Sequence, residues 1–419
     1  MKPARALLKA ASAAVDLACQ LTHPADAVLR EFFRDHHELG SHDRAFVAEA
    51  VFTVLRHKRL LETIVPDPTP RRLVIASLVK LQGMGIGTLE PLLAREDRDW
   101  LVEVKRAQTE ALPAAVRLSL PDWLWERLEA QLGEVEATAL GRALLAPAAL
   151  DLRVNTLITG RDEVLLELER GGIAAEPVRY SPVGVRLEGK PAVSRHPLYA
   201  RGAIEVQDEG SQLLGFLVAP RRREMVVDFC AGAGGKTLLM GALMQNQGRL
   251  YAFDVSDKRL NGLKPRLKRS QLSNVHPQLI GGENDARIKR LGGKIDRVLV
   301  DSPCSGFGTL RRNPDMKWRQ SPEGLDELMA KQRSILKGAA QLLKPGGRLV
   351  YATCSLLREE NEDTVEHFLA AHSGFRLLDC QEVLDDQRIG LETGRFFRVY
   401  PHRHGTDGFF AAVLEKSSG

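Results

Sequence analysis

The sequence predicts an α/β protein whose main part is a doubly wound, mostly parallel sheet, preceded by a small α/β module and an all-helical region. Three observations predict it. Residues 4 to about 140 place apolar side chains at helical spacing and show no strand pattern. From about residue 206, short apolar strands alternate with helices, which is typical of a parallel sheet. A glycine-rich turn leads from the first of these strands into a helix.

The length fits this division. A chain of 419 residues, 44% hydrophobic, is too long for one small core and suits two or three domains. We expect a helical domain over residues 1–142, a small α/β module over 143–205 and the larger α/β domain over 206–419.

The helical domain is predicted from two early stretches of apolar residues at helical spacing. They are Leu7, Leu8, Ala11, Ala14, Val15 and Ala18, and then Phe46, Val47, Ala50, Val51, Val54 and Leu55. Ser41-x-Asp43 is a start signal for the second helix. Proline-rich residues 66–70 and glycine-rich residues 83–87 separate helices.

The small module is predicted as a strand over 150–155, a helix over 161–170 and a second strand over 178–187. In the larger domain we expect seven strands, the last of them antiparallel. They cover residues 225–230, 250–255, 277–280, 297–300, 348–353, 375–378 and 409–414.

The composition argues against several classes of protein. Five cysteines without a Cys-x-x-Cys pair support neither a disulfide framework nor a zinc ribbon, and they fit a reducing compartment. We find no signal peptide and no membrane-spanning stretch. We therefore expect a cytoplasmic protein without bound metal, and a monomer. The net charge of +5 is by itself only weak support for a nucleic-acid partner.

The glycine turn spans Cys230-Ala231-Gly232-Ala233-Gly234-Gly235-Lys236 and follows the buried strand 225–230. Such a turn lets a ligand approach the backbone and the N–H groups of the next helix. A P-loop needs glycine where Cys230 stands, and a dinucleotide fingerprint needs it where Thr237 stands. Both patterns therefore fail.

An acid ends the next strand, as in folds that bind adenosine. Asp254 stands about 20 residues after the turn, where a carboxylate accepts hydrogen bonds from ribose hydroxyls. The ligand then contains adenosine but need not carry phosphate, and S-adenosylmethionine is the natural candidate. Asp301 ends the next strand but one, and Asp285 follows the strand between them, with Glu283 as a rival for contact with adenine.

Two cysteines follow strands of the same sheet, Cys304 in a Pro-Cys-Ser turn and Cys354 in a Thr-Cys-Ser turn. Attack of a thiolate on C6 of cytosine makes C5 nucleophilic enough to accept an activated methyl group. The C5 proton must then leave and the thiol must be eliminated. Two cysteines can divide this work, one attacking and one assisting release. Cys19 and Cys380 are expected to be structural, and Cys230 to pack beside the glycine turn.

At these residues the chain resembles the RNA (cytosine-5)-methyltransferase family, and most of all its bacterial branch that modifies 16S ribosomal RNA. The matching segments are residues 206–212, 228–237, 301–306, 311–318, 351–355 with 359–361, and 407–410. Residues 153–155 are similar to the RNA-binding module of that family, and residues 43–46 and 54–56 to the NusB-like domain of the 16S branch. The glycine turn departs from the family because Ala233 replaces the usual proline.

The resemblance implies a role for each site residue. Cys354 would be the nucleophile, and Cys304 would assist product release. S-adenosylmethionine would bind to Cys230, Ala231, Gly232, Ala233, Gly234, Gly235, Lys236, Asp254, Asp285 and Asp301. Asp301 would in addition hold the target base. The fold implied is a Rossmann-like methyltransferase domain after a NusB-like domain.

RNA contacts are expected beside the Cys304 turn, where cations surround an aromatic ring. The candidates are Arg311, Arg312, Lys317 and Trp318, with Arg319 next to them. A second basic stretch over residues 258–269 lies on a predicted helix, and a solvated helix face explains it equally well. The target cytosine would have to leave its stack to reach both sulfurs.

The leading hypothesis is therefore an enzyme that methylates cytosine in 16S rRNA. The alternatives are the same chemistry on tRNA, or an RNA-binding assembly factor that retains the fold without catalysis. A DNA cytosine methyltransferase is disfavoured, because the Glu-Asn-Val motif of those enzymes is missing.

Overall fold

The computed structural model describes residues 5–94 and 96–418, so the first four residues of the predicted N-terminal domain lie outside it. The chain forms two compact units. The first contains the residues up to Pro147 together with Thr309–Pro322. The second contains Ala148–Gly308 and the chain from Glu323 onward. The segment Thr309–Pro322, predicted within the larger α/β domain, thus packs with the helical unit.

The described residues of the first unit form helices and connecting loops but no strand, as predicted. Its helices are α1 (Arg5–Cys19), α2 (Ala25–Asp35), α3 (Ser41–Arg56), α4 (Lys58–Ile64), α5 (Pro70–Ala76), the π-turn η1 (Ser77–Leu81), α6 (Ile86–Leu89), η2 (Glu90–Leu92), α7 (Asp97–Arg106), α8 (Ala114–Arg117), α9 (Asp122–Leu132), α10 (Glu134–Leu144) and α17 (Met316–Arg319). The apolar stripe predicted on α1 is buried along its whole length. The proline-rich break ends where Thr69 caps α5 and Pro70 occupies its first turn.

The small module of the second unit is an antiparallel sheet of order β2-β3-β1-β4. Its elements are β1 (Leu150–Val154), α11 (Arg161–Arg170), β2 (Ala175–Pro177), β3 (Gly184–Leu187), η3 (Val193–Arg195), α12 (Pro197–Ala200) and β4 (Ile204–Val206). The single strand predicted over 178–187 is wrong. A turn at Tyr180 and Ser181, whose main-chain N–H groups both donate to Glu209, separates β2 from β3. The short strand β4 was missed.

The larger sheet has the order β10-β12-β9-β8-β5-β6-β7, and β11 pairs with β12. Its strands are β5 (Met225–Asp228), β6 (Arg249–Asp254), β7 (Val275–Leu279), β8 (Ile295–Asp301), β9 (Leu343–Thr353), β10 (Phe375–Leu378), β11 (Phe397–Val399) and β12 (Phe409–Lys416). Strands β5 to β9 pair in parallel, and β12 runs antiparallel to β9 as predicted. The predicted doubly wound fold is confirmed, and only β11 was not foreseen.

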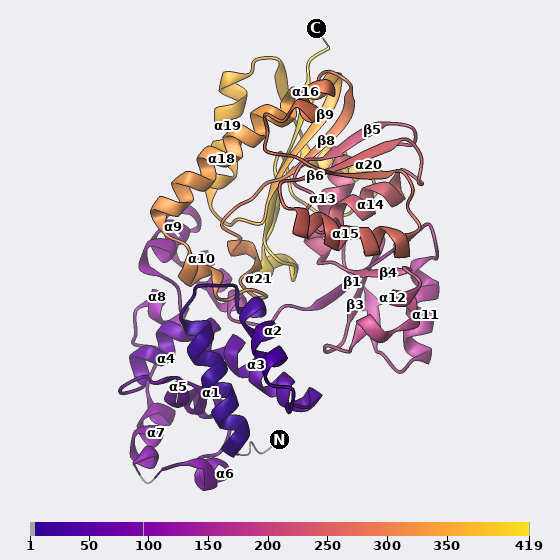
Figure 1. The fold of residues 1–419 in the computed structure, drawn as a ribbon. Coiled ribbons are helices and arrows are strands. Elements are labelled where there is room, and N and C mark those ends of the chain that lie inside the picture. Colours follow the sequence, from indigo (N-terminus) through magenta and orange to yellow (C-terminus); the bar gives the residue numbers. More distant parts are fainter. Residues whose placement is uncertain (1–4, 95, 419) are drawn as a thin grey trace. The chain divides into compact units, whose positions relative to one another are not determined.

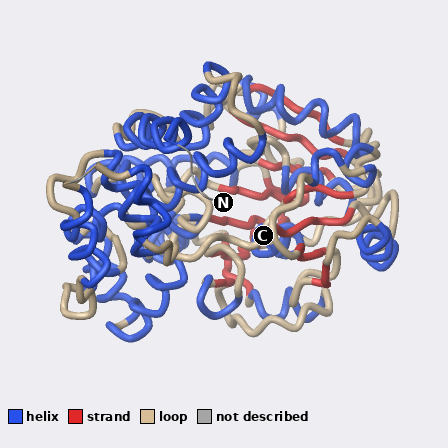
Figure 2. The backbone as a smooth tube through the Cα atoms, turned by 90° about the horizontal axis from the view of Figure 1, so that it is seen from below, coloured by secondary structure: helices blue, strands red, loops and turns tan. Residues whose placement is uncertain are grey.

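Helices cover both faces of this sheet (Figure 1). Side chains of α13 (Glu209–Val218), α14 (Gly235–Leu243), α15 (Asp257–Ser270) and α20 (Cys380–Asp386) share a core with one face. Those of α16 (Ala286–Arg290), α18 (Pro322–Ala340) and α19 (Glu362–Ala371) share a core with the other. The remaining short elements are η4 (Phe307–Thr309), η5 (Arg358–Glu360) and α21 (Pro401–His404). Figure 2 shows the strands of this unit in red among their helices.

In the part of the chain that the structure describes, no helix combines the length and the apolar character needed to cross a membrane.

Candidate active site

The carboxyl ends of β5, β6 and β8 border a cavity of about 490 Å³. The sheet order reverses on either side of β5, and ligands of open α/β sheets bind where this reversal occurs. All residues of its lining belong to the second unit. They are Gln207, Ser211, Phe229, Cys230, Ala231, Gly232, Ala233, Gly235, Lys236, Asp254, Val255, Arg259, Ile280, Glu283, Asp301, Pro303, Cys304, Lys331 and Ile335.

The glycine turn joins β5 to α14 and forms one wall of the cavity. Gly234 has φ 84°, and a Cβ atom there would lie 2.1 Å from the Leu263 Cδ1 atom of α15. Only glycine allows both this left-handed backbone and this close packing. Arg266 of α15 donates a hydrogen bond of 2.6 Å to the Ala233 carbonyl, so a neighbouring helix holds the turn from outside.

Asp254 fixes the far side of the same turn. Its two carboxylate oxygens accept the Gly232 and Ser256 main-chain N–H groups, each at 2.8 Å. The side chain is buried but still borders the cavity. Because each carboxylate oxygen has a second lone pair, Asp254 can also accept hydrogen bonds from two ligand hydroxyls.

Lys236 and Asp301 form an ion pair of 2.7 Å between α14 and the end of β8. Burial acts to lower the pKa of Lys236, but the charge of Asp301 and the hydrogen bond to it outweigh burial, so the pKa is raised. The ammonium also lies 5.6 Å from the centre of the Phe409 ring. A charged lysine is thus held at the cavity wall.

Asp228 lies beneath the turn and is 1% exposed. Thr237 donates to its Oδ2 atom at 2.7 Å, and its Oδ1 atom has no hydrogen-bond partner. Burial raises the pKa of Asp228 to about 7. This carboxyl group therefore titrates near neutrality, which sequence reasoning did not foresee.

The two turns that carry cysteines bring their sulfurs together: Cys304 Sγ and Cys354 Sγ are 3.4 Å apart. Contact with Cys354, followed by burial, raises the pKa of the Cys304 thiol well above its ordinary range. Cys304 therefore keeps its proton at neutral pH and can donate it toward Cys354. The expected proximity of the two thiols is present, beside the cavity that Cys304 borders.

A close approach of two glycines fixes the Cys354 turn. The Gly308 N–H donates to the Cys354 carbonyl, and the Gly408 N–H donates to the Gly308 carbonyl, both at 2.8 Å. A Cβ atom on Gly308 would lie 2.0 Å from the Gly408 carbonyl oxygen. The segment 407–410 is therefore part of the structure that supports the site.

Most of the predicted cofactor residues border the cavity, but Gly234 and Asp285 do not. Gly234 packs behind the turn. Asp285 caps α16, where its carboxylate accepts the Gly281 and Arg287 N–H groups, each at 2.8 Å. Its rival Glu283 does border the cavity. Burial acts to raise the pKa of Glu283, but hydrogen bonds from Lys331 and Ser334 outweigh burial and lower this pKa to about 2.

Sequence reasoning missed the contribution of α18, whose Lys331 and Ile335 reach the cavity. No motif marks them, since α18 has an ordinary amphipathic pattern. Gln207 and Ser211 also line the cavity and lie in the segment 206–212, which the family resemblance had singled out.

The predicted RNA contacts lie in the first unit. The Lys317 side chain is 3% exposed, and its Nζ atom donates to the Arg56 carbonyl at 2.8 Å. Trp318 Nε1 donates to the Leu55 carbonyl at 2.8 Å, and Arg311 donates to the Pro147 carbonyl at 3.2 Å. The prediction that Lys317 faces RNA is wrong, because its amine is buried inside the first unit. Arg311, Arg312 and Trp318 are half-buried and stay predictions.

The second basic stretch, on α15, is partly neutralised. Glu205 of β4 accepts from Arg266 at 2.9 Å and from Arg269 at 2.5 Å. These two cations therefore bind the small module to α15. Lys258, Lys264 and Lys268 are exposed on the same helix.

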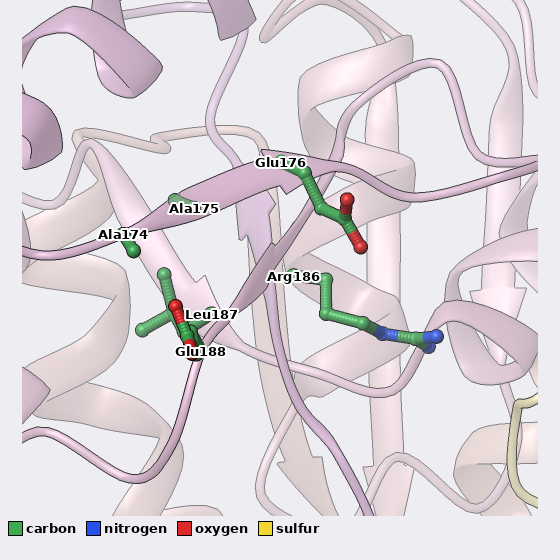
Figure 3. Close-up of a pocket in the computed structure, with 6 residues that line it drawn as sticks. All are labelled: Ala174, Ala175, Glu176, Arg186, Leu187 and Glu188. Atoms are coloured by element: carbon green, nitrogen blue, oxygen red, sulfur yellow. The ribbon is translucent and has the colours of Figure 1, made fainter.

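Another cavity, of about 400 Å³, lies on the small module (Figure 3). Arg186, which borders it, donates both to Asp151 Oδ1 at 2.8 Å and to Asp151 Oδ2 at 2.9 Å. The other charged residues of the lining are Glu176 and Glu188. With its arginine engaged and two carboxylates left, this cavity does not favour an RNA phosphate.

The large cavity fits S-adenosylmethionine. Its volume lies in the range of small-molecule sites. Phe229, Val255 and Ile280 supply apolar surface for a base. Asp254 supplies acceptors for ribose hydroxyls, and main-chain N–H groups at the start of α14 suit a carboxylate. The sheet order, the glycine turn and the paired thiols together define an S-adenosylmethionine-dependent methyltransferase.

Comparison with known proteins narrows this class. The family model described as 16S rRNA methyltransferase RsmB/F matches residues 215–415, and the RsmF/B-like ferredoxin-like domain matches residues 120–194. The chain belongs to the RsmB/F family of 16S rRNA methyltransferases. The predicted family, enzyme class and methyl donor are thereby confirmed.

Three similar proteins illustrate the match. The probable ribosomal RNA small subunit methyltransferase B of Synechocystis is 32% identical over 91% of this chain and 93% of its own. Ribosomal RNA small subunit methyltransferase B of Serratia proteamaculans is 35% identical over 75% of this chain and 72% of its own. The crystal structure of PH0851 superposes with a TM-score of 0.83 and 27% identity, covering 99% of this chain and 100% of that one.

Proposed function

We propose that this enzyme methylates C5 of a cytosine in 16S rRNA through a covalent bond between Cys354 and C6. The observation that carries the proposal is the 3.4 Å contact between the two sulfurs beside the donor cavity. A nucleophile and an acid–base partner must both reach one flipped base, and a pair of touching thiols meets this requirement.

The residues take these roles. Cys354 attacks C6 as the thiolate. The bound cofactor supplies an electrophilic methyl group, which C5 of the activated ring accepts. A general base then takes the C5 proton, the electrons of that C–H bond re-form the C5–C6 double bond, and the Cys354–C6 bond breaks to release the thiolate, with Cys304 assisting this second half. The Lys236–Asp301 pair faces the base, where its charged groups can hold the ring by hydrogen bonds.

The cofactor would be held by the glycine turn over residues 230–236 and by Asp254 and Asp301. Support comes from their common place in the cavity lining, Gly234 excepted. For the adenine edge we now favour Glu283 over Asp285, since only Glu283 borders the cavity. We further propose that the enzyme acts in the cytoplasm as a monomer, and that Arg311, Arg312 and Trp318 help to bind RNA.

The test is methylation with labelled S-adenosylmethionine of small-subunit rRNA that lacks the modification, with total tRNA as a parallel substrate. We expect label in rRNA as 5-methylcytosine, mapped to one position. Label found only in tRNA would show that tRNA, and not 16S rRNA, is the substrate. No label in either RNA, with cofactor bound at ordinary affinity, would favour the assembly factor.

A further inference from the structure

Glu360 is a fully buried carboxylate next to both cysteine turns. It ends the short helix η5 (Arg358–Glu360) and is 0% exposed. A buried carboxylate is costly unless hydrogen bonds satisfy it. The hydrogen-bond partners of Glu360 therefore indicate its role.

The first set of partners belongs to the Cys304 turn. Glu360 Oε1 accepts the Ser305 main-chain N–H at 2.8 Å, and Oε2 accepts the Ser305 hydroxyl at 2.5 Å. Gln332 of α18 donates from Nε2 both to Glu360 Oε1 at 2.9 Å and to the Pro303 carbonyl at 3.1 Å. The turn is thus held on either side of Cys304.

The second partner belongs to the Cys354 turn. The Ser355 hydroxyl donates to the same Oε2 atom, and the hydroxyls of Ser305 and Ser355 lie 3.1 Å apart. Each serine directly follows one of the cysteines. Among the residues that the structure describes, all donors to Glu360 are neutral, so no counter-charge anchors it elsewhere.

We propose that Glu360 is a positioning residue that ties the two cysteine turns together and thereby sets the separation of their sulfurs. Its catalytic consequence rests on the proposed function, but its geometry does not. The negative charge has a further effect. After the contact with Cys354 and burial, Glu360 adds to the causes that raise the pKa of Cys304. One carboxylate then sets the distance between the thiols and adds a smaller electrostatic effect on the ionisation of one of them.

Cross-linking of the thiols tests the distance. Diamide removes two electrons and two protons from a thiol pair, which leaves a disulfide, and it does so fast only where the sulfurs can meet. We expect the wild type to form the Cys304–Cys354 disulfide readily. Glu360→Gln should cross-link within about threefold of this rate, because the amide keeps an acceptor for the Ser305 N–H. Glu360→Ala should be slower by about tenfold or more, since both turns lose their shared anchor.

Alkylation tests the charge. Rates of iodoacetamide modification at Cys304, measured by peptide mass spectrometry from pH 6 to 10.5, report its thiolate fraction. In Glu360→Gln the alkylation rate of Cys304 at alkaline pH should be higher than in the wild type, because the carboxylate no longer opposes ionisation. Glu366→Gln is the matched control: it removes a charge from the exposed face of α19, where Glu366 pairs with Arg358, and should leave both readouts unchanged.

Cross-linking of Glu360→Ala at the wild-type rate, or an unchanged alkylation rate of Cys304 at alkaline pH in Glu360→Gln, would overturn the proposal. If Glu360→Ala does not fold, Ser355→Ala takes its place: it removes only the hydrogen bond between the Cys354 turn and Glu360, and it should also slow cross-linking. Cross-linking of Ser355→Ala at the wild-type rate would contradict the proposal. All of these measurements are made without RNA, so a failure of the proposed rRNA methylation would leave them standing, and their failure would not touch it.

Discussion

Two lysines with little exposed surface, Lys236 and Lys317, show how differently this chain uses the same side chain. Lys236 is 12% exposed and pairs with Asp301, so its pKa is raised in spite of burial. Lys317 is 3% exposed and has a carbonyl as its acceptor, and burial lowers its pKa far below the ordinary value. A carboxylate partner decides whether a buried lysine keeps its charge. The charged lysine borders the cavity, and the other one supports the helical unit.

The largest effect is expected at the charged lysine. Lys236→Met removes the partner of Asp301 at the cavity wall, and methylation should fall by about 100-fold or more, as for the loss of one charge-stabilising group in an active site. Initial rates and calorimetric cofactor affinity measure this. An activity within threefold of the wild type would contradict the assigned role of the pair.

Asp228 extends the contrast to acids, because it is buried without the ion pair that Asp301 has. Its pKa is about 7 in the folded chain and near 3.9 when unfolded, so the folded state binds the extra proton. Stability should therefore fall as pH rises from about 4 to 7, by at most about 4 kcal/mol. Asp228→Asn should remove this fall and raise the melting temperature above pH 7.

Melting curves of the wild type and Asp228→Asn at pH 5 and 8 test this. The two proteins should differ more at pH 8. Thr237→Val is a useful control, because it removes the hydrogen bond to Asp228 but keeps the carboxylate. A difference that is equal at both pH values would mean that Asp228 does not titrate in this range.

The smallest effect is expected at the second lysine. For Lys317→Met the lost hydrogen bond to Arg56 and the lost cost of burying an amine oppose each other, so stability at pH 7 should change by less than about 2 kcal/mol. Because the pKa of Lys317 is lower in the folded state than in the unfolded state, the wild type becomes more stable as pH rises toward about 10.4. The variant should lack this gain in stability.

RNA binding provides the second readout for this lysine. Lys317→Met should bind RNA with unchanged salt dependence, whereas loss of a cation that neutralises a phosphate reduces that slope by about one. A smaller salt dependence of RNA binding in Lys317→Met would mean that Lys317 does contact an RNA phosphate, and the contrast between the two lysines would then fail.

Much of this fold could be predicted because local pattern and tertiary structure agree. The strand 375–378 and the helix 161–170 were predicted to the residue, and the apolar stripe of α1 is the buried one. The errors have physical causes. The N–H groups of Tyr180 and Ser181, where the strand breaks, donate to Glu209, which lies 29 and 28 residues further along the chain, and no local signal reveals these bonds.

The same holds for the site. The sequence could predict that the glycine turn, Asp254 and Asp301 lie near one another and near the two cysteines, because the carboxyl ends of parallel strands converge at one edge of the sheet. Lys331 was missed because its helix reaches the cavity only through tertiary packing. Lys317 was taken for an exposed cation because no local signal shows that its segment packs with the helical unit, where the side chain is buried.

The central claim is that the two touching thiols have different tasks, and one measurement tests it most directly. Cys304→Ala and Cys354→Ala are each incubated with substrate rRNA and S-adenosylmethionine, and covalent protein–RNA adducts are resolved under denaturing conditions and mapped by mass spectrometry. We predict that Cys304→Ala accumulates an adduct at Cys354 and that Cys354→Ala forms none. An adduct at Cys304 in the Cys354→Ala protein, with none in Cys304→Ala, would reverse the two roles and contradict the account.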